Sequence, residues 1–305
     1  MVKWLLCGAA MISGIVIAAE TENRSFQFGN FEVIAVQDAL SAMRFELFPG
    51  MPEEEFLRLT GGGRVPSSVN VFLLKRGDGK IILVDAGNGG KRGGMLRKLE
   101  QSGVFPESVD FILLTHMHGD HIGGLLGKHG EAVFSRALVY VSMPEWEFWQ
   151  NGTDGLQGKQ VRKVLHAYGS RVRTFRFGEE VLPGIKALDA SGHTPGHTVF
   201  ETDSLLIVGD LLHAAALQIP RPEVCTIYDM NPSGAVQARR RFYEFAASSS
   251  KPVAGMHLPY PGIGRIGRSA AGYVYLPGRG ERIKKTRYND ASRNSMPGCL
   301  GKPFP

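Results

Sequence analysis

The sequence of 305 residues has little cysteine and, beyond its first 19 residues, no long apolar run. Three cysteines are too few for a disulfide-stapled scaffold. With 43% hydrophobic residues the chain is too apolar for a disordered protein, and its polar residues are too evenly spread for a bundle of membrane helices. No internal repeat is visible and no linker-like stretch interrupts the central region. We therefore expect one large domain over residues 20–277.

The first 19 residues are typical of an export signal. Lys3 supplies a positive start, residues 4–19 are apolar, and small residues precede Glu20, as signal cleavage requires. The apolar run is shorter than the roughly 20 residues that a membrane span needs. We expect a periplasmic or secreted protein with no transmembrane span after cleavage; an uncleaved anchor is the alternative. In an oxidising compartment Cys225 and Cys299 can pair, or they can be two unrelated thiols.

The formal charge of +6 comes from the ends of the chain. Residues 278–305 form a basic tail with seven basic and two acidic residues. With that tail and Lys3 set aside, 27 of the 35 basic and 27 of the 29 acidic residues remain, so the body is neutral. Binding to nucleic acid would require a basic face on the protein, so a nucleic-acid partner is disfavoured. Arg239, Arg240 and Arg241 are expected on a solvated helix face. The tail is expected to be extended, either simply solvated or in contact with an anionic surface or a partner subunit.

Short strands dominate the expected secondary structure, and helices lie between them. The expected helices cover residues 94–101, 160–167 and 233–247. The expected strands cover residues 26–36, 69–75, 81–84, 111–114, 137–141, 185–188, 199–202, 205–208 and 273–276. This alternation favours two sheets covered by helices. Residues 39–66 lie between two of these strands, and their length suggests a flap or a dimer contact.

A histidine-rich segment follows directly on the apolar strand at residues 111–114. It contains His116, His118, Asp120 and His121. Residues two apart in an extended segment project to the same side, so His116 and His118 can bind one ion, while Asp120 and His121 can address a second. Imidazole and carboxylate ligands suit zinc or another first-row divalent metal. A histidine-rich surface loop is the alternative interpretation.

Further ligand candidates follow other apolar runs. They are His193, Asp210 and His257, each expected in a loop at one end of a sheet. His197 belongs to the same stretch as His193 but is expected to be structural. His129 and His166 have no motif around them and are expected to be solvated.

In this order the motifs resemble those of the metallo-β-lactamase superfamily. The resemblance rests on Asp85 in Val-Asp-Ala-Gly, on the His-x-His-x-Asp-His segment, on Gly-His-Thr-Pro-Gly-His at residues 192–197, on Asp210 and on His257. It covers roughly residues 26–277. It implies a four-layer αβ/βα sandwich with the site at the edge of the two sheets.

The resemblance also implies a role for each of these residues. His116, His118 and His193 would bind one metal ion, Asp120, His121 and His257 would bind the other, and Asp210 would bridge the two. Asp85 would support the histidine-rich loop, or be an ordinary turn residue. The expected cofactors are two divalent ions, zinc first, with manganese, iron or cobalt as alternatives.

Such a site predicts hydrolysis. A water shared by two divalent ions loses a proton near neutral pH and becomes a hydroxide nucleophile, and Asp120 can pass a proton to the leaving group. The chain has no Gly-x-Ser-x-Gly elbow for a serine nucleophile. A non-catalytic binding protein would be expected to have lost at least one ligand position.

The bridging aspartate bears on the substrate. Typical β-lactam-hydrolysing members lack it, so Asp210 favours the lactonase, glyoxalase II, nuclease and phosphotriesterase branches. The closest local likeness is to the methyl parathion hydrolase-like and lactonase-like group, through residues 147–149, 209–218 and 257–264. Lactonases of the superfamily carry tyrosine three residues after the bridging aspartate, where this chain has His213. His213 can be catalytic or a buried structural histidine.

These expectations describe an exported hydrolase that acts on a small, largely uncharged ester, lactone or phosphotriester. Hydrolysis of β-lactams is the first alternative, and a nuclease is less favoured. A homodimer is a possible oligomeric state. Apolar side chains near the motifs can either line the mouth of the site or pack in the core; they are Trp146, Phe148, Trp149, Leu217, Ile219 and Tyr260.

Overall fold

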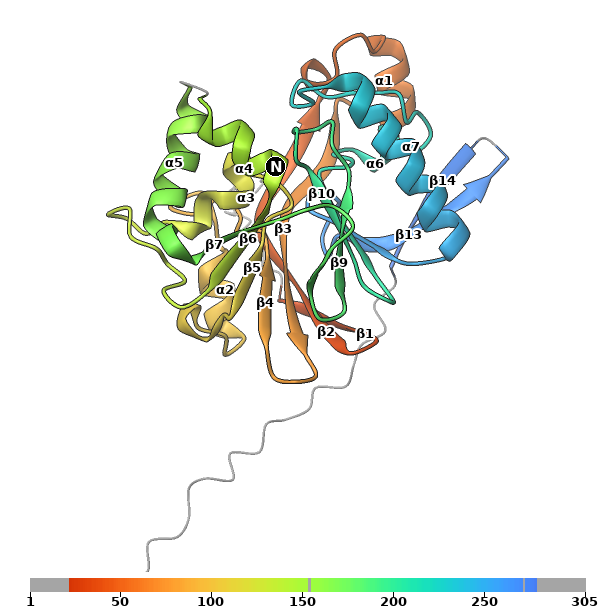
Figure 1. Ribbon diagram of the computed structural model, residues 1–305. Helices are drawn as coiled ribbons and strands as arrows, with labels where there is room; N and C mark the ends of the chain where they lie inside the picture. The colour runs from red at the N-terminus through yellow and green to blue at the C-terminus, as the bar shows by residue number, and fades with distance from the viewer. Residues whose placement is uncertain (1–21, 153–154, 271, 279–305) are drawn as a thin grey trace, which may run out of the picture.

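The computed structural model describes residues 22–152, 155–270 and 272–278 (Figure 1). The expected export signal, the basic tail and Cys299 lie outside these residues. Cys225 forms no disulfide within the described part of the chain. No helix among the described residues combines the length and the apolar character needed to cross a membrane.

Two seven-stranded sheets form the centre of the molecule. The first sheet follows chain order and contains β1 (Arg24–Phe28), β2 (Phe31–Arg44), β3 (Arg64–Arg76), β4 (Ile81–Val84), β5 (Phe111–Leu113), β6 (Leu138–Ser142) and β7 (Val172–Phe175). The second contains β8 (Glu180–Leu182), β9 (Ile185–Asp189), β10 (Thr198–Glu201), β11 (Leu206–Gly209), β12 (Val253–Gly255), β13 (Ile263–Ser269) and β14 (Gly272–Pro277). The hairpin-joined strands pair antiparallel, whereas β4 to β7 pair parallel, as do β11 and β12.

Helices cover the outer faces of both sheets (Figure 1). The α-helices are α1 (Glu53–Thr60), α2 (Met95–Gln101), α3 (Gly119–Ile122), α4 (Met143–Gln150), α5 (Leu156–Tyr168), α6 (Ala215–Gln218) and α7 (Pro232–Ser249), of which α1 and α6 pack in a separate cluster. Helix α5 packs its buried Val161 and Val164 against the first sheet, and α7 packs Phe242 against the second. The predicted αβ/βα sandwich is therefore confirmed.

Three apolar layers hold these elements together. Between the sheets, Phe72 and Ile82 of the first meet Phe200 and Ile207 of the second, all four fully buried. Burial of side chains of this size contributes about 1.5–3 kcal/mol each relative to exposure. The other two layers lie under the outer helices. The core thus fixes the two sheets relative to each other, and with them the strand ends that carry the candidate ligands.

Two local expectations were wrong. Residues 26–36 form two strands rather than one, because Gly29 takes a left-handed conformation (φ 56°) and the chain reverses there. Residues 39–66 are not one long loop, because β2 and β3 stay paired as far as Arg44 and Arg64; a flap or a dimer contact formed by this segment stays a prediction. Helix α1, between them, buries Phe56 in a small cluster with Leu217 of α6.

Candidate metal centre

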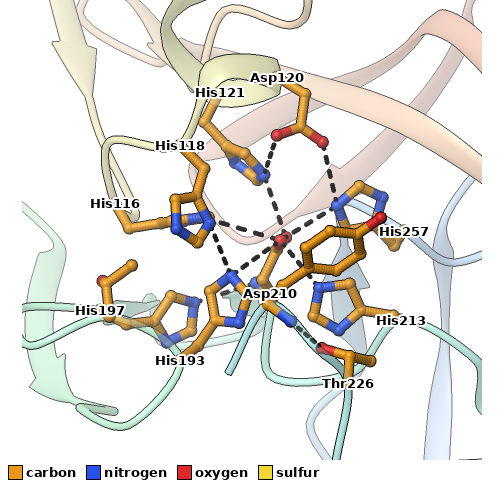
Figure 2. A network of polar contacts seen from close by, with 12 residues as sticks. His116, His118, Asp120, His121, His193, His197, Asp210, His213, Thr226 and His257 are labelled. Atoms are coloured by element: carbon orange, nitrogen blue, oxygen red, sulfur yellow. Dashed lines mark hydrogen bonds and ion pairs between the residues drawn. The ribbon is translucent and has the colours of Figure 1, made fainter. Parts of the chain in front are cut away.

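The candidate ligands lie beyond the carboxyl ends of neighbouring strands. His116 and His118 follow β5, Asp210 follows β11, and His257 follows β12. His193 lies in the loop between β9 and β10. Because β5 and the β11–β12 pair belong to different sheets, the site forms where the two sheets meet at one edge. Figure 2 shows these side chains pointing toward a common centre around the Asp210 carboxylate.

We call His116, His118 and His193 the first site. The His118 Nδ1 atom lies 3.0 Å from His193 Nε2, and His193 Nε2 lies 3.4 Å from Asp210 Oδ2. His116 Nε2 lies 3.7 Å from the same carboxylate oxygen. One nitrogen from each imidazole and one oxygen of Asp210 lie within 4.8 Å of one another.

We call Asp120, His121 and His257 the second site. The two oxygens of Asp120 reach in different directions: Oδ1 lies 3.7 Å from His121 Nε2 and Oδ2 lies 3.4 Å from His257 Nε2. Asp210 contacts this site as well, with Oδ1 at 3.2 Å from His121 Nε2 and Oδ2 at 3.1 Å from His257 Nε2. Asp210 therefore lies between the two sites, as the bridging role requires.

The donor atoms fit divalent ions. His116 Nε2, His121 Nε2 and Asp210 Oδ1 are buried and have no hydrogen-bond partner among the described residues. Buried polar atoms are otherwise nearly always hydrogen-bonded, and each of these three is directed toward the centre of the cluster. Imidazole nitrogen and carboxylate oxygen are ligands for zinc and other first-row metals. The first site can hold one ion, the second site another, and Asp210 can contribute to both.

The protonation of these groups is set by burial and by the crowded charges. Burial lowers the pKa of His118 to about 3. Burial also disfavours a proton on His121, but the carboxylates of Asp210, Asp85 and Asp120 outweigh it and raise that pKa well above its ordinary value. Burial would raise the pKa of Asp210, yet the surrounding histidines, His121 first, hold it well below the usual range. Asp210 therefore carries a negative charge at neutral pH at the centre of the site.

Residues 64–260 match the sequence profile of the metallo-beta-lactamase superfamily. The chain belongs to this superfamily. The matched region contains every residue of both sites and Asp210.

Individual relatives support this placement. Metallo-beta-lactamase domain-containing protein 1 of Xenopus laevis is 31% identical over 169 residues, which cover 54% of this chain and 61% of that protein. An N-acyl homoserine lactonase of a Bacillus species is 28% identical over 99 residues, or 32% of this chain and 35% of the relative. This chain thus spans about three fifths or less of these curated relatives.

Solved structures share the fold over nearly all their length. The hydrolase AbOPH, of the beta lactamase superfamily, superposes with a TM-score of 0.78 at 29% identity, covering 86% of this chain and 99% of that one. The dizinc quorum-quenching lactonase AidC has the same TM-score at 24% identity, with 84% and 97% covered, and shows the fold alone.

Asp85 lies behind the second site, as its place in the superfamily motif implies. Its carboxylate accepts hydrogen bonds from the Thr115 backbone N–H (2.8 Å) and hydroxyl (2.7 Å), and lies 2.7 Å from His121 Nδ1. Asp85 itself adopts a left-handed conformation, with φ at 59°. It therefore fixes both the start of the histidine-rich segment and the ring orientation of His121. His257 is oriented by backbone instead, through Nδ1 at 3.0 Å from the Ser68 carbonyl oxygen.

His213 lies against the ligands. Its side chain is buried, Nε2 lies 3.2 Å from Asp210 Oδ2, and its ring stacks on that of His257 with centroids 5.0 Å apart. Neither ring nitrogen has a hydrogen-bond partner among the described residues. Burial lowers the pKa of His213, although Asp210 opposes this, so the imidazole is neutral near pH 7. Asp210, His213 and His257 also lie close enough together to share an ion.

The other histidines are placed as expected. His197 is buried; its Nε2 accepts the backbone N–H of Asp210 at 3.0 Å and its Nδ1 lies 3.2 Å from the Ala190 carbonyl oxygen. It therefore positions Asp210 with both nitrogens already engaged. His129 and His166 are exposed.

Most of the aromatic and aliphatic candidates pack in the core. Leu217 and Ile219 are buried, and Tyr260 donates its hydroxyl to the Ala35 carbonyl oxygen. Trp149 is buried too, with its ring edge-on to His118 at a centroid distance of 6.2 Å. Trp146 and Phe148 are half-buried against the first sheet's helical layer. Trp149 is thus the member of this group that touches a candidate ligand.

Sequence reasoning missed two carboxylates that support the first site. Asp229 lies 2.9 Å from His193 Nδ1 through one oxygen, while the other accepts a hydrogen bond from Arg239 at 3.3 Å. The expectation that Arg239 is solvated was wrong: it is fully buried, whereas Arg240 and Arg241 are exposed. The second missed carboxylate is Glu145, which is fully buried on α4. Neither residue lies in a superfamily motif.

Proposed function

We propose that the protein is a two-metal hydrolase that acts on small, largely uncharged ester-type substrates: lactones, carboxylic esters or organophosphate triesters. The observation that carries the proposal is the pair of three-residue sites joined by the Asp210 carboxylate. Relatives named as N-acyl homoserine lactonase and hydroxyacylglutathione hydrolase, the latter 30% identical over 142 residues, support hydrolysis of ester-type bonds.

Two bound divalent ions would supply a deprotonated water near neutral pH and polarise the substrate oxygen. The chain's own residues would transfer the protons. Water adds across the ester bond: its oxygen goes to the acyl or phosphoryl centre, and a proton goes to the leaving alcohol. Asp120, only partly buried, can pass that proton, and its pKa is lowered because His121 and His257 outweigh the effect of burial. His213, neutral and adjacent, can donate a hydrogen bond to the substrate oxygen.

The surface beside the site supports an uncharged substrate. Ile227, Tyr228 and Met230 are large apolar side chains with exposed fractions of 57%, 42% and 45%. They belong to a loop that touches the site directly: the Met230 N–H donates to the His193 carbonyl oxygen at 3.0 Å, and the Tyr228 ring lies 5.9 Å from the His213 ring. Exposed apolar groups concentrated beside a site favour binding of an apolar substrate.

Within this class, we propose the organophosphate-hydrolysing, methyl parathion hydrolase-like group as the closest. The proposal rests on the local likeness around Asp210 and His257; the 29% identity to hydrolase AbOPH supports hydrolysis without naming a substrate. We also propose export to the periplasm or beyond, on the apolar segment at residues 4–19. N-terminal sequencing of protein recovered from an envelope fraction tests the export proposal, because a start at residue 19 or 20 is expected.

The decisive experiment combines metal analysis with parallel assays on a lactone, an aryl phosphotriester, an aryl ester and a cephalosporin. We expect two metal equivalents per chain and turnover of at least one of the first three substrates. Turnover of the lactone without the phosphotriester would overturn the narrower group assignment. Turnover of the cephalosporin alone would replace the ester proposal with β-lactam hydrolysis.

A further inference from the structure

Glu145 is a buried carboxylate outside every motif of the site. It lies in the first turn of α4 and is fully buried. No lysine or arginine within the described residues lies at ion-pair distance from it. A buried carboxylate without a cation is costly unless its oxygens are hydrogen-bonded. Its hydrogen-bond partners therefore show what it does in the fold.

The two oxygens of Glu145 bind two different loops. Oε1 accepts the backbone N–H of Met117 at 2.9 Å and the Trp149 indole N–H at 2.7 Å. Oε2 accepts the Thr194 hydroxyl at 2.7 Å and the backbone N–H of Gly196 at 2.9 Å. All four donors are satisfied by one carboxylate group.

These loops carry the whole first site. Met117 lies between His116 and His118, and Thr194 directly follows His193. The first loop belongs to one sheet and the second loop to the other, so no strand pairing connects them. A backbone bond from the Thr198 N–H to the Thr115 carbonyl oxygen (2.9 Å) joins the two sheets beside the site, and Glu145 adds side-chain bonds to both loops.

The close approach of α4 to the second loop supports the same role. A Cβ atom at Gly196 would lie 2.2 Å from the Glu145 nitrogen, so only glycine fits there. The Ser142 hydroxyl, at the start of α4, donates to the Gly196 carbonyl oxygen at 2.7 Å. The first turn of α4 is thus docked on the loop that carries His193.

We infer that Glu145 is a positioning residue for the first site, setting the separation of the His116–His118 pair from His193 without contacting an ion itself. The inference rests on the metal-binding part of the proposed function. Groups that orient ligands from behind typically change metal affinity by about 10–100-fold when they are replaced. The second site has its own support in Asp85 and does not contact Glu145.

The test uses the full chain, stripped of metal and titrated with zinc in competition with a chromophoric chelator. Wild-type protein should bind two equivalents. His118→Ala and His257→Ala give the references for loss of the first and the second site. Glu145→Gln should weaken one binding step by about 10–100-fold, and that step should be the one missing in His118→Ala.

Matched variants separate positioning from general damage. Glu147→Gln, an exposed glutamate on the same helix, should bind both equivalents as wild type does. Thr194→Val keeps the carboxylate and removes one donor, and should weaken the same step by about fivefold. The absorption spectrum of the cobalt-substituted protein should change in Glu145→Gln and remain unchanged in Glu147→Gln.

The outcomes separate the two proposals. If the wild type binds no metal, the proposed function fails. If the wild type binds two equivalents and Glu145→Gln binds both with unchanged affinity, only the positioning role fails. If Glu145→Gln does not fold, Thr194→Val decides: an unchanged first-site affinity there overturns the inference.

Discussion

The two candidate metal sites are supported in different ways. The second site is held by the backbone carbonyl of Ser68 in β3 and by Asp85, which belongs to a superfamily motif and also bonds Thr115 at the start of the histidine-rich segment. The first site is held by Glu145 of α4 and by Asp229 in the loop before α7. The supports of the second site lie in or directly after strands of the first sheet, whereas those of the first site lie in α4 and in a loop. Two adjacent candidate sites therefore depend largely on separate parts of one chain.

Replacing Asp210 should disturb both sites at once, because its carboxylate contacts imidazoles of both. Asp210→Ala should lower kcat/KM by more than about 100-fold, beyond the range expected for residues behind the ligands. Metal analysis of the purified variant should show loss from both sites. Retention of two equivalents and wild-type turnover would contradict the bridging role.

Removing a ligand from one site at a time should separate the two. His118→Ala and His257→Ala are each expected to bind one equivalent and to lose most turnover, because two-metal chemistry requires both ions. Equilibrium dialysis with zinc measures the stoichiometry, and steady-state assays measure turnover. Asp120→Ala should behave as His257→Ala does. Unchanged turnover in either of those two second-site variants would sink the two-metal mechanism.

Replacing a carboxylate behind the candidate ligands should affect mainly one site. Asp229→Asn should weaken first-site binding by about 10–100-fold, whereas Asp85→Asn should weaken second-site binding by a similar factor. Asp229→Asn should also lower the free energy of unfolding by about 3 kcal/mol, because it leaves the buried Arg239 guanidinium without its anion. Chemical denaturation of the metal-free variants measures this, with Arg240→Gln as an exposed control.

The pH dependence should differ within the first site. In the metal-free protein burial lowers the pKa of His193, but hydrogen bonds that the ring donates to the Asp210 and Asp229 carboxylates outweigh it and raise the pKa from 6.5 to about 9. His193 must lose that proton to bind a metal, so first-site affinity should rise by about tenfold per pH unit between pH 7 and 9. His118, with a pKa of about 3, releases no proton in this range.

The same shift has a consequence for stability. A folded-state pKa above the unfolded value means that His193 stabilises the metal-free protein most below pH 6.5, and that this contribution is lost as pH rises through about 9. Denaturant midpoints of the metal-free protein at pH 6.5 and 9 check the sign, with Asp229→Asn as the variant in which the difference should shrink.

The smallest effect on turnover is expected for a substitution beside the site, at Tyr228. Tyr228→Ala should raise KM for an apolar ester by about fivefold, the value of roughly 1 kcal/mol of lost apolar contact, and should leave metal content unchanged. Phe105→Ala is the control, because Phe105 is similarly exposed and makes no ring contact with the site. Equal changes in both variants would remove the proposed substrate contact.

Several strands, and the motif residues that follow them, could be predicted from local sequence patterns. The apolar runs that became β4, β5 and β11 are continuous, and the motif residues Asp85, His116 and Asp210 follow within three positions of their ends. The short helices α3 and α6, of four residues each, were not predicted, because four residues contain too little of a 3.6-residue period to detect. The Gly29 turn was missed because apolar residues continue on both sides of it.

The supports of the first site could not be found in this way. Glu145 lies three residues after Ser142 at the start of a helix, a spacing typical of a capping box. Ser142 does accept the Glu145 N–H at 3.3 Å, but the carboxylate turns away to Met117 and Gly196. Asp229 lies 36 residues from His193 with no motif between them. Such contacts exist only once the sheets and helices are packed together.

The buried Arg239 holds its neighbouring loop in a way that leaves the loop's outward side chains free to vary. The Arg239 guanidinium donates to the carbonyl oxygens of Leu211, Pro222 and Val224. The loop leading to Asp229 is therefore held mainly through its backbone carbonyls. The outward side chains at positions 227, 228 and 230 take no part in these bonds. Substitutions there can accumulate without disturbing the candidate metal ligands, so the apolar surface beside the site can change while the ligand set stays constant.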